Sequence, residues 1–226
     1  MKAKNIIQVA GVIDAEEAGM LLNLGADYLG FPLRLTVNKE DLSESDAKEV
    51  IRTTKIQDKA VLITYLDSAA EIIKLSDFLN VKIVQLHGKI SEEELVKTKY
   101  LRPDIEIIKS LVVAQNNFSE LERIVKNFSN WVSAFITDTF DPATGAEGAT
   151  GKTHDWNVSR KLVELSDKPV IIAGGLNPRN VKEAIVKIKP AGVDVHTGVE
   201  NKDGRKSFEL VKKFIEEAKE GFGIIA

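Results

Sequence analysis

The feature that most constrains this sequence is a series of eight short apolar runs separated by amphipathic stretches. Runs such as Val61-Leu62-Ile63 and Val170-Ile171-Ile172 lack the alternation of a strand that faces water on one side. Continuous apolar runs of this length are typical of parallel strands that are covered on both faces. The eight expected strands span residues 6–10, 26–31, 60–65, 82–86, 105–111, 132–137, 169–173 and 193–197.

Helical patterns fill the intervals between these runs. Ile72, Leu75 and Leu79 recur at a spacing that places them on one face of a helix. Asp14 and Ser91 each precede a glutamate by three residues, which is the spacing of a capping box. Asn177-Pro178 predicts a further helix start, with proline at the first helical position after an asparagine cap. Strand and helix therefore alternate, an order that builds a parallel sheet.

Closure of eight such units predicts an α/β fold, a single (β/α)8 barrel or TIM barrel, as one domain over residues 1–226. An open doubly wound sheet is the alternative that the same pattern allows. The longest non-periodic stretch, 139–153, is polar and glycine-rich and follows the sixth expected strand. A loop of this length in a compact domain is usually functional or mobile.

Composition excludes several classes of function. Net charge is −3 with 29% charged residues, so nothing indicates a nucleic acid or an anionic membrane as partner. Because cysteine is absent, disulfides, thiolate metal sites and a cysteine nucleophile are excluded. The three histidines lack metal-ligand spacing, and we expect neither a metal nor another cofactor. No signal peptide or bilayer-length apolar run is recognisable, which predicts a cytoplasmic protein.

Functional groups in such a barrel lie at the carboxyl ends of the strands. The last two expected strands end in glycine turns, Gly174-Gly175 and Thr197-Gly198. Glycine lets the backbone approach a ligand closely, and the N–H groups at a helix start favour a phosphate. The final two strands of such barrels often supply this site. We therefore expect a phosphorylated small molecule here, the alternative being that these glycines only form tight turns.

Two side chains at other strand ends could carry chemistry. Asp138 ends the apolar run before it, and a carboxylate there could serve as a general acid or base, or could anchor a loop. His87 ends the run Val84-Gln85-Leu86, and it could bind a ligand or pack at the rim.

Several segments together resemble the phosphoribosylanthranilate isomerase family of tryptophan biosynthesis. They include Val84-Gln85-Leu86-His87-Gly88, a glycine-rich stretch leading into His154-Asp155-Trp156, and Ala173-Gly174-Gly175-Leu176-Asn177-Pro178. The matching segments occur in order, at residues 10–18, 25–31, 84–88, 148–156, 173–181 and 192–200. The resemblance implies an Amadori rearrangement, in which an N-linked ribose phosphate of anthranilate opens and becomes an aminodeoxyribulose phosphate.

The resemblance also implies roles for individual residues. Asp138 would be the general acid that protonates the ring oxygen. Substrate near the anthranilate end would contact Arg34, Gln85 and His87. The backbone that holds the phosphate would be that of Gly151, Gly174, Gly175, Thr197 and Gly198.

The chain departs from the family pattern at the general base. The family's cysteine at the end of strand one is Ala10, its lysine two residues earlier is Gln8, and a serine after strand eight is His196. Alanine cannot accept a proton, and a catalytic base contributes ~10²–10⁴-fold in rate. His196, His154 and Asp67 are the candidates that could replace it.

Two alternatives follow from this departure, and a third follows from the fold, which several sugar-phosphate enzymes share. The chain could be a paralogue acting on a different phosphorylated sugar, or a non-catalytic sugar-phosphate binder. It could also be an aldolase of the same fold, for which Lys109 would be the Schiff-base lysine. A monomer and a homodimer are both compatible with the sequence.

Overall fold

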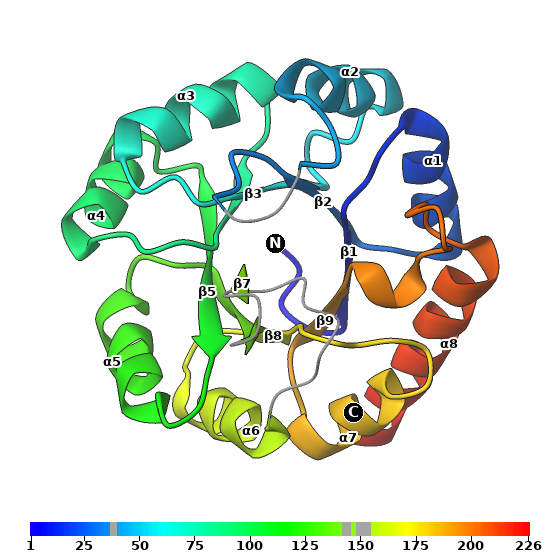
Figure 1. The fold of residues 1–226 in the computed structure, drawn as a ribbon. Helices are drawn as coiled ribbons and strands as arrows, with labels where there is room; N and C mark the ends of the chain where they lie inside the picture. Colours follow the sequence, from blue (N-terminus) through cyan, green and yellow to red (C-terminus); the bar gives the residue numbers. More distant parts are fainter. Residues whose placement is uncertain (37–39, 142–145, 148–154) are drawn as a thin grey trace.

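The computed structural model describes residues 1–36, 40–141, 146–147 and 155–226. Within these ranges eight parallel strands close into a barrel, because β9 pairs with β1 and β5 with β6 (Figure 1). The strands are β1 (Ile6–Ala10), β2 (Tyr28–Pro32), β3 (Ala60–Thr64), β4 (Ile83–Leu86), β5 (Glu106–Val113), β6 (Ala134–Asp141), β8 (Val170–Ile172) and β9 (Gly192–Val195). This closure confirms the expected barrel and rules out the alternative of an open sheet. A two-residue strand not expected from the sequence, β7 (Ala146–Glu147), pairs antiparallel with the end of β6.

Helices surround the barrel in chain order (Figure 1). They are α1 (Ala15–Leu24), α2 (Glu44–Thr54), α3 (Ala69–Leu79), α4 (Glu92–Leu101), α5 (Phe118–Phe128), α6 (Trp156–Leu165), α7 (Val181–Ile188) and α8 (Phe208–Ile225), with a short 3₁₀ helix η1 (Thr197–Val199) after β9. Asp14 and Ser91 accept the backbone N–H three residues on, as the capping spacing predicts.

The start of α7 differs from the prediction made on Asn177-Pro178. Asn177 does cap the chain, since its Oδ1 accepts the Arg179 N–H at 2.9 Å. The residues that follow form a turn, and the regular helix begins only at Val181. The side chain of Asn180 is used to close this turn, because its Oδ1 accepts the Asn177 N–H at 2.8 Å. The strand end is thereby tied to the helix start.

Two apolar clusters make up the core. The larger lies between the strands and the surrounding helices, and the smaller fills the barrel interior, because alternate side chains of each strand point to opposite faces. Met1 packs against the interior cluster and its ammonium pairs with Glu106, so the N-terminus lies in the middle of the barrel in Figure 1. The interior cluster consists of Ile6, Ala10, Tyr28, Val61, Ile63, Ile83, Ile108, Ala134, Ile136, Ile171 and Ala173.

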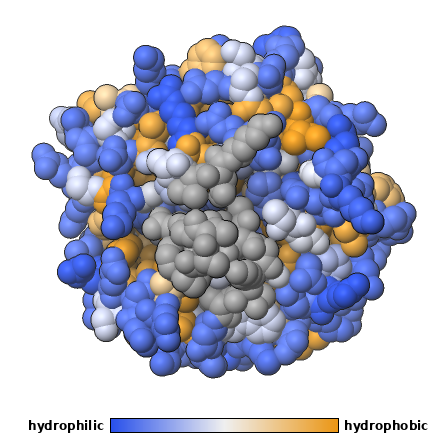
Figure 2. Space-filling view, in the orientation of Figure 1, coloured by the Kyte–Doolittle hydropathy of each residue, from blue (hydrophilic) through white to orange (hydrophobic). Residues whose placement is uncertain are grey.

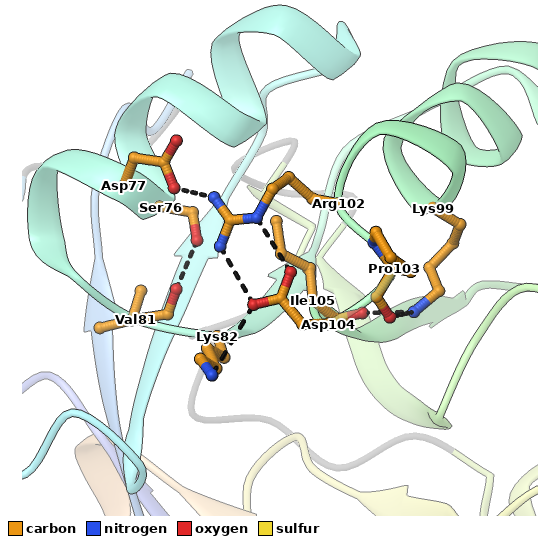
Figure 3. Close-up of polar contacts among 9 residues, drawn as sticks. All are labelled: Ser76, Asp77, Val81, Lys82, Lys99, Arg102, Pro103, Asp104 and Ile105. Atoms are coloured by element: carbon orange, nitrogen blue, oxygen red, sulfur yellow. Dashed lines mark hydrogen bonds and ion pairs between the residues drawn. The ribbon is translucent and has the colours of Figure 1, made fainter.

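Charged side chains tie the chain together where β4 and β5 begin (Figure 3). The Arg102 guanidinium pairs with Asp77 of α3 and, at 2.9 Å, with Asp104 of the turn before β5. Lys99 donates to the carbonyls of Pro103 and Ile105 at 2.8 and 2.6 Å. These side chains are partly exposed, so each pair contributes modestly to stability. They lie at the end of the barrel opposite the candidate site.

The helices that the structure describes are too short or too polar to span a bilayer. On the face shown in Figure 2, hydrophilic side chains prevail around the periphery, with smaller hydrophobic areas between them.

Candidate active site

Asp138, the predicted general acid, lies on β6 at the carboxyl end of the barrel. Its Oδ1 accepts the Thr139 N–H at 2.7 Å, and its Oδ2 lies 4.0 Å from His87 Nε2. The side chain is only 13% exposed. Burial raises the pKa of Asp138, while the His87 charge and the Thr139 N–H oppose the rise. The carboxyl therefore keeps its proton to a higher pH than an exposed aspartate, as a general acid must.

His87 is held in place beside this carboxyl. Its Nδ1 lies 3.0 Å from Ser110 Oγ of β5, and its ring packs against Tyr65 with the ring centroids 5.0 Å apart. His87 and Ser110 are both buried. The ends of β4, β5 and β6 thus bring Ser110, His87 and Asp138 into one row. The sequence reading missed Ser110, although its alternation with the interior residue Ile108 was a usable signal.

A polar layer lies inside the barrel beside Asp138. Gln85 is buried, and its Oε1 accepts from Gln8 Nε2 at 3.0 Å, so the predicted substrate contact bonds to another strand. Asp194 of β9 stands opposite Gln8 of β1 in the strand register. Burial, and next the Asp138 charge, raise the pKa of Asp194 to about 7, while a Gln8 hydrogen bond and Lys206 oppose the rise.

Asp194 was not singled out from the sequence. The available signal was a carboxylate between Val193 and Val195 in a strand otherwise apolar. Among the described residues, Asp194 Oδ1 and Gln8 Oε1 are buried oxygens with no hydrogen-bond partner.

The two glycine turns after β8 and β9 pack against each other. Gly174 and Gly175 have φ values of 89° and 64°, in the region that favours glycine. Their N–H groups donate to no acceptor within the described part of the chain. A Cβ on Gly198 of η1 would lie 1.9 Å from the Leu176 carbonyl oxygen, so only glycine allows this contact. The two turns, including Thr197, form one rim that can bind an anion through main-chain N–H groups.

His196 lies at the same rim, beside the end of β1. A Cβ on Gly11 would lie 2.0 Å from its Nε2, so the ring covers the backbone that follows Ala10. His196 Nε2 is 3.3 Å from Glu200 Oε1 and 3.7 Å from Asp41 Oδ2. Burial, followed by the Lys206 charge, lowers the pKa of His196 to about 3, so the ring is neutral at neutral pH.

The remaining candidates lie as follows. The Arg34 guanidinium pairs with Glu44 of α2 at 2.7 Å and with Glu71 of α3 at 3.6 Å. Asp67 is exposed in the loop after β3. Gly151 and His154 lie outside the described residues. No cluster of three or more histidine, aspartate or glutamate side chains suited to a metal occurs in the part of the chain that the structure covers.

Lys109, the candidate Schiff-base lysine, is buried on β5. Its Nζ donates to the carbonyls of Leu86, Gly88 and Ser110 at 3.2, 3.0 and 3.0 Å. These bonds engage all three protons of the ammonium. The lysine therefore links β4 to β5, and this arrangement does not favour an aldolase.

Known proteins match this chain over nearly its whole length. The profile of a family described as N-(5'phosphoribosyl)anthranilate (PRA) isomerase matches residues 7–217. N-(5'-phosphoribosyl)anthranilate isomerase 2 of Methanosarcina mazei is 36% identical, covering 96% of this chain and 95% of the relative. The enzyme of that family from Methanothrix thermoacetophila is 32% identical over 92% and 95% of the two chains. The crystal structure of phosphoribosyl anthranilate isomerase from Thermotoga maritima superposes with a TM-score of 0.79 at 28% identity, over 96% and 99%.

Proposed function

Because this chain belongs to the N-(5'-phosphoribosyl)anthranilate isomerase family, we propose that it catalyses the isomerase reaction of tryptophan biosynthesis. The substrate would be N-(5-phosphoribosyl)anthranilate and the product the aminodeoxyribulose phosphate. The structural observation that carries the proposal is Asp138, a buried carboxyl with a raised pKa at the mouth of the barrel.

The first chemical step needs a proton on the ring oxygen. Asp138 donates it while the bond between C1 and that oxygen breaks, and the anthranilate nitrogen forms a double bond to C1. His87 Nε2 lies 4.0 Å from Asp138 Oδ2, and Ser110 Oγ, 3.0 Å from His87 Nδ1, fixes the orientation of the ring. A carboxyl that keeps its proton to a higher pH than an exposed aspartate is suited to this step.

The phosphate would bind at the rim formed by the turns after β8 and β9. The N–H groups of Gly174 and Gly175 support this assignment, with Thr197 and Gly198 of η1 beside them. Fixing the phosphate there directs the anthranilate ring across the mouth towards β2 and β4, near Arg34 and His87. Arg34 would exchange its Glu44 or Glu71 partner for the anthranilate carboxylate. The family resemblance would add Gly151 to the proposed phosphate site, and His196 would be one candidate for the missing base.

We further propose that the enzyme acts in the cytoplasm, as a single domain and as a monomer or homodimer. One related structure is of monomers generated from a dimeric phosphoribosylanthranilate isomerase of Thermotoga maritima, and the dimeric state of that enzyme supports the homodimer.

The test is turnover of N-(5-phosphoribosyl)anthranilate by the purified protein and by Asp138→Asn. We expect wild-type turnover and a kcat lower by ~10²–10⁴-fold in the variant, with thermal unfolding unchanged within a few degrees. Asp104→Asn, at the opposite end of the barrel, is the matched control and should keep wild-type kcat. Absence of wild-type turnover, or an Asp138→Asn variant as active as wild type, would contradict the proposal.

A further inference from the structure

Removal of the C2 proton requires a base, and the methyl group of Ala10 cannot supply one. Asp194 lies next to this position on the interior face of the barrel. It stands opposite Gln8, two residues before Ala10 on the neighbouring strand β1. The residue is 8% exposed and its Oδ1 is buried, so the carboxyl lies within the barrel. The interior side chain above Gln8 on β1 is the methyl group of Ala10.

Asp194 also shares a level of the barrel with the acid Asp138. Thr137 of β6 pairs with Ile172 of β8, and Ile172 pairs with Val193 of β9. One residue further along each strand lie Asp138, Ala173 and Asp194. The only side chain that β8 places between the two carboxyls is therefore the Ala173 methyl. Their charges interact, since the Asp138 charge raises the pKa of Asp194.

The unpartnered oxygens of this layer point to a proton acceptor. Asp194 Oδ1 and Gln8 Oε1 are both buried acceptors without a donor in the described part of the chain. An ionised carboxylate in that setting is poorly solvated, which makes it a strong base. A protonated Asp194 carboxyl could donate to a neighbouring acceptor, and Gln8 Oε1 is such an acceptor.

Two departures of this chain from its family act on the same carboxyl. A lysine in place of Gln8 would give Asp194 a cationic partner and lower its basicity. The neutral Gln8 leaves the carboxyl basic, next to the strand end that has lost its thiol. Among the residues that the structure describes, the titratable groups that shift the pKa of Asp194 are Asp138 from β6 and Lys206 from the segment before α8, while β1 contributes Gln8.

His196 is less suited to the same task. Its pKa of about 3 makes the imidazole a weak base, whereas a pKa of about 7 matches the operating pH. Its Nε2 is also directed at Glu200 and Asp41 rather than at the barrel interior.

We propose that Asp194 removes the C2 proton of the substrate, directly or through one water molecule; this inference rests on the proposed function. The C–H bond at C2 breaks and its electron pair forms a double bond between C1 and C2, while the electron pair of the C1–nitrogen double bond moves to nitrogen. Asp194 gains a proton and Asp138 has given one to the ring oxygen, so solvent exchange between the two carboxyls restores the starting state. The enol then loses its O2 proton and gains one at C1, which completes the isomerisation.

The first experiment compares wild type with Asp194→Asn. We expect kcat to fall by at least ~100-fold, while KM changes less than threefold. The ascending limb of the wild-type pH profile, near pH 7, should disappear. The amide has nearly the shape of the carboxyl and can donate to Gln8 Oε1, so the variant should fold. Asp104→Asn is the control, with wild-type kcat and pH profile.

The second experiment adds Ala10→Cys to Asp194→Asn. If the missing function is a base, the thiolate should restore kcat at least tenfold. No gain would mean that the amide had only misplaced the substrate, and the assignment would be overturned.

The two proposals fail differently. Wild-type turnover that Asp138→Asn abolishes and Asp194→Asn leaves within threefold would contradict Asp194 as the base and leave the isomerase activity standing. Absence of wild-type turnover would contradict the isomerase itself.

Discussion

Gln8 and Asp194 stand opposite each other on β1 and β9, and each carries a buried oxygen that accepts no hydrogen bond from any described residue. A layer of this kind weakens a barrel core, because buried polar groups without partners cost free energy. It also holds a carboxyl whose pKa is about 7 beside the acid Asp138. Stability and proton transfer therefore depend on the same pair of residues.

Replacing Asp194 with asparagine should stabilise the fold at high pH. The pKa of about 7 in the folded protein lies above the 3.8 of an ordinary aspartate. The folded state therefore binds more protons between these values, and stability falls as the pH rises from about 4 to 7. Asp194→Asn removes this loss and should raise the free energy of unfolding by up to about 4 kcal/mol at pH 8 and by almost nothing at pH 4. Urea denaturation across this range measures the difference.

The control for this experiment is Asp104, whose pKa is shifted in the opposite direction. Hydrogen bonding to Arg102 lowers the pKa of Asp104, so its contribution to stability is present above the ordinary pKa and is lost in acid. Asp104→Asn should therefore leave stability at pH 8 equal or slightly lower. An Asp194→Asn variant that is no more stable than wild type at pH 8 would mean that burial of the ionised carboxyl does not destabilise the fold.

Replacing Gln8 with lysine should make Asp194 a weaker base. The ammonium opposite the carboxyl favours its ionised form and lowers its pKa. We expect the ascending limb of the kcat profile to move below pH 7 and kcat at neutral pH to fall, because a weaker base removes the C2 proton more slowly. The measurement is kcat between pH 4 and 9. Gln8→Met, of similar length without charge, is the control, and an equal shift in that variant would show that charge is not the cause.

The barrel could be predicted from the sequence because its signals are local. Apolar runs and capping residues each depend on a few neighbouring positions, so the starts of α1 and α4 could be predicted from the single residues Asp14 and Ser91. The start of α7 was placed too early, since the turn after Asn177 has the same residue preferences as a helix start. Strand β7 was missed because two residues carry no periodicity.

Only part of the candidate site could be predicted from the sequence. Asp138 and the glycine turns could be named from their positions at strand ends. The environment of a charged side chain could not be predicted, because it depends on strands that are far apart in the chain. Asp194 reads as one polar residue in a strand until closure places it near Asp138 and Gln8. Lys109 reads as a nucleophile until its carbonyl partners on and after β4 are known.

Replacing Gly174 with alanine should impair phosphate binding. Its φ of 89° strains any side chain, and a Cβ there would lie 2.1 Å from Thr139 Oγ1, so the turn must move. Gly204→Ala is the matched control, with a φ of 84° and nothing within 4 Å of the added carbon. Both variants carry the backbone strain of about 1–2 kcal/mol, but only Gly174→Ala shifts the rim. We expect inorganic phosphate to raise the unfolding temperature of wild type and of Gly204→Ala. The concentration of phosphate needed for the same effect on Gly174→Ala should be at least tenfold higher. Equal stabilisation of all three proteins would mean that the phosphate does not bind at this rim.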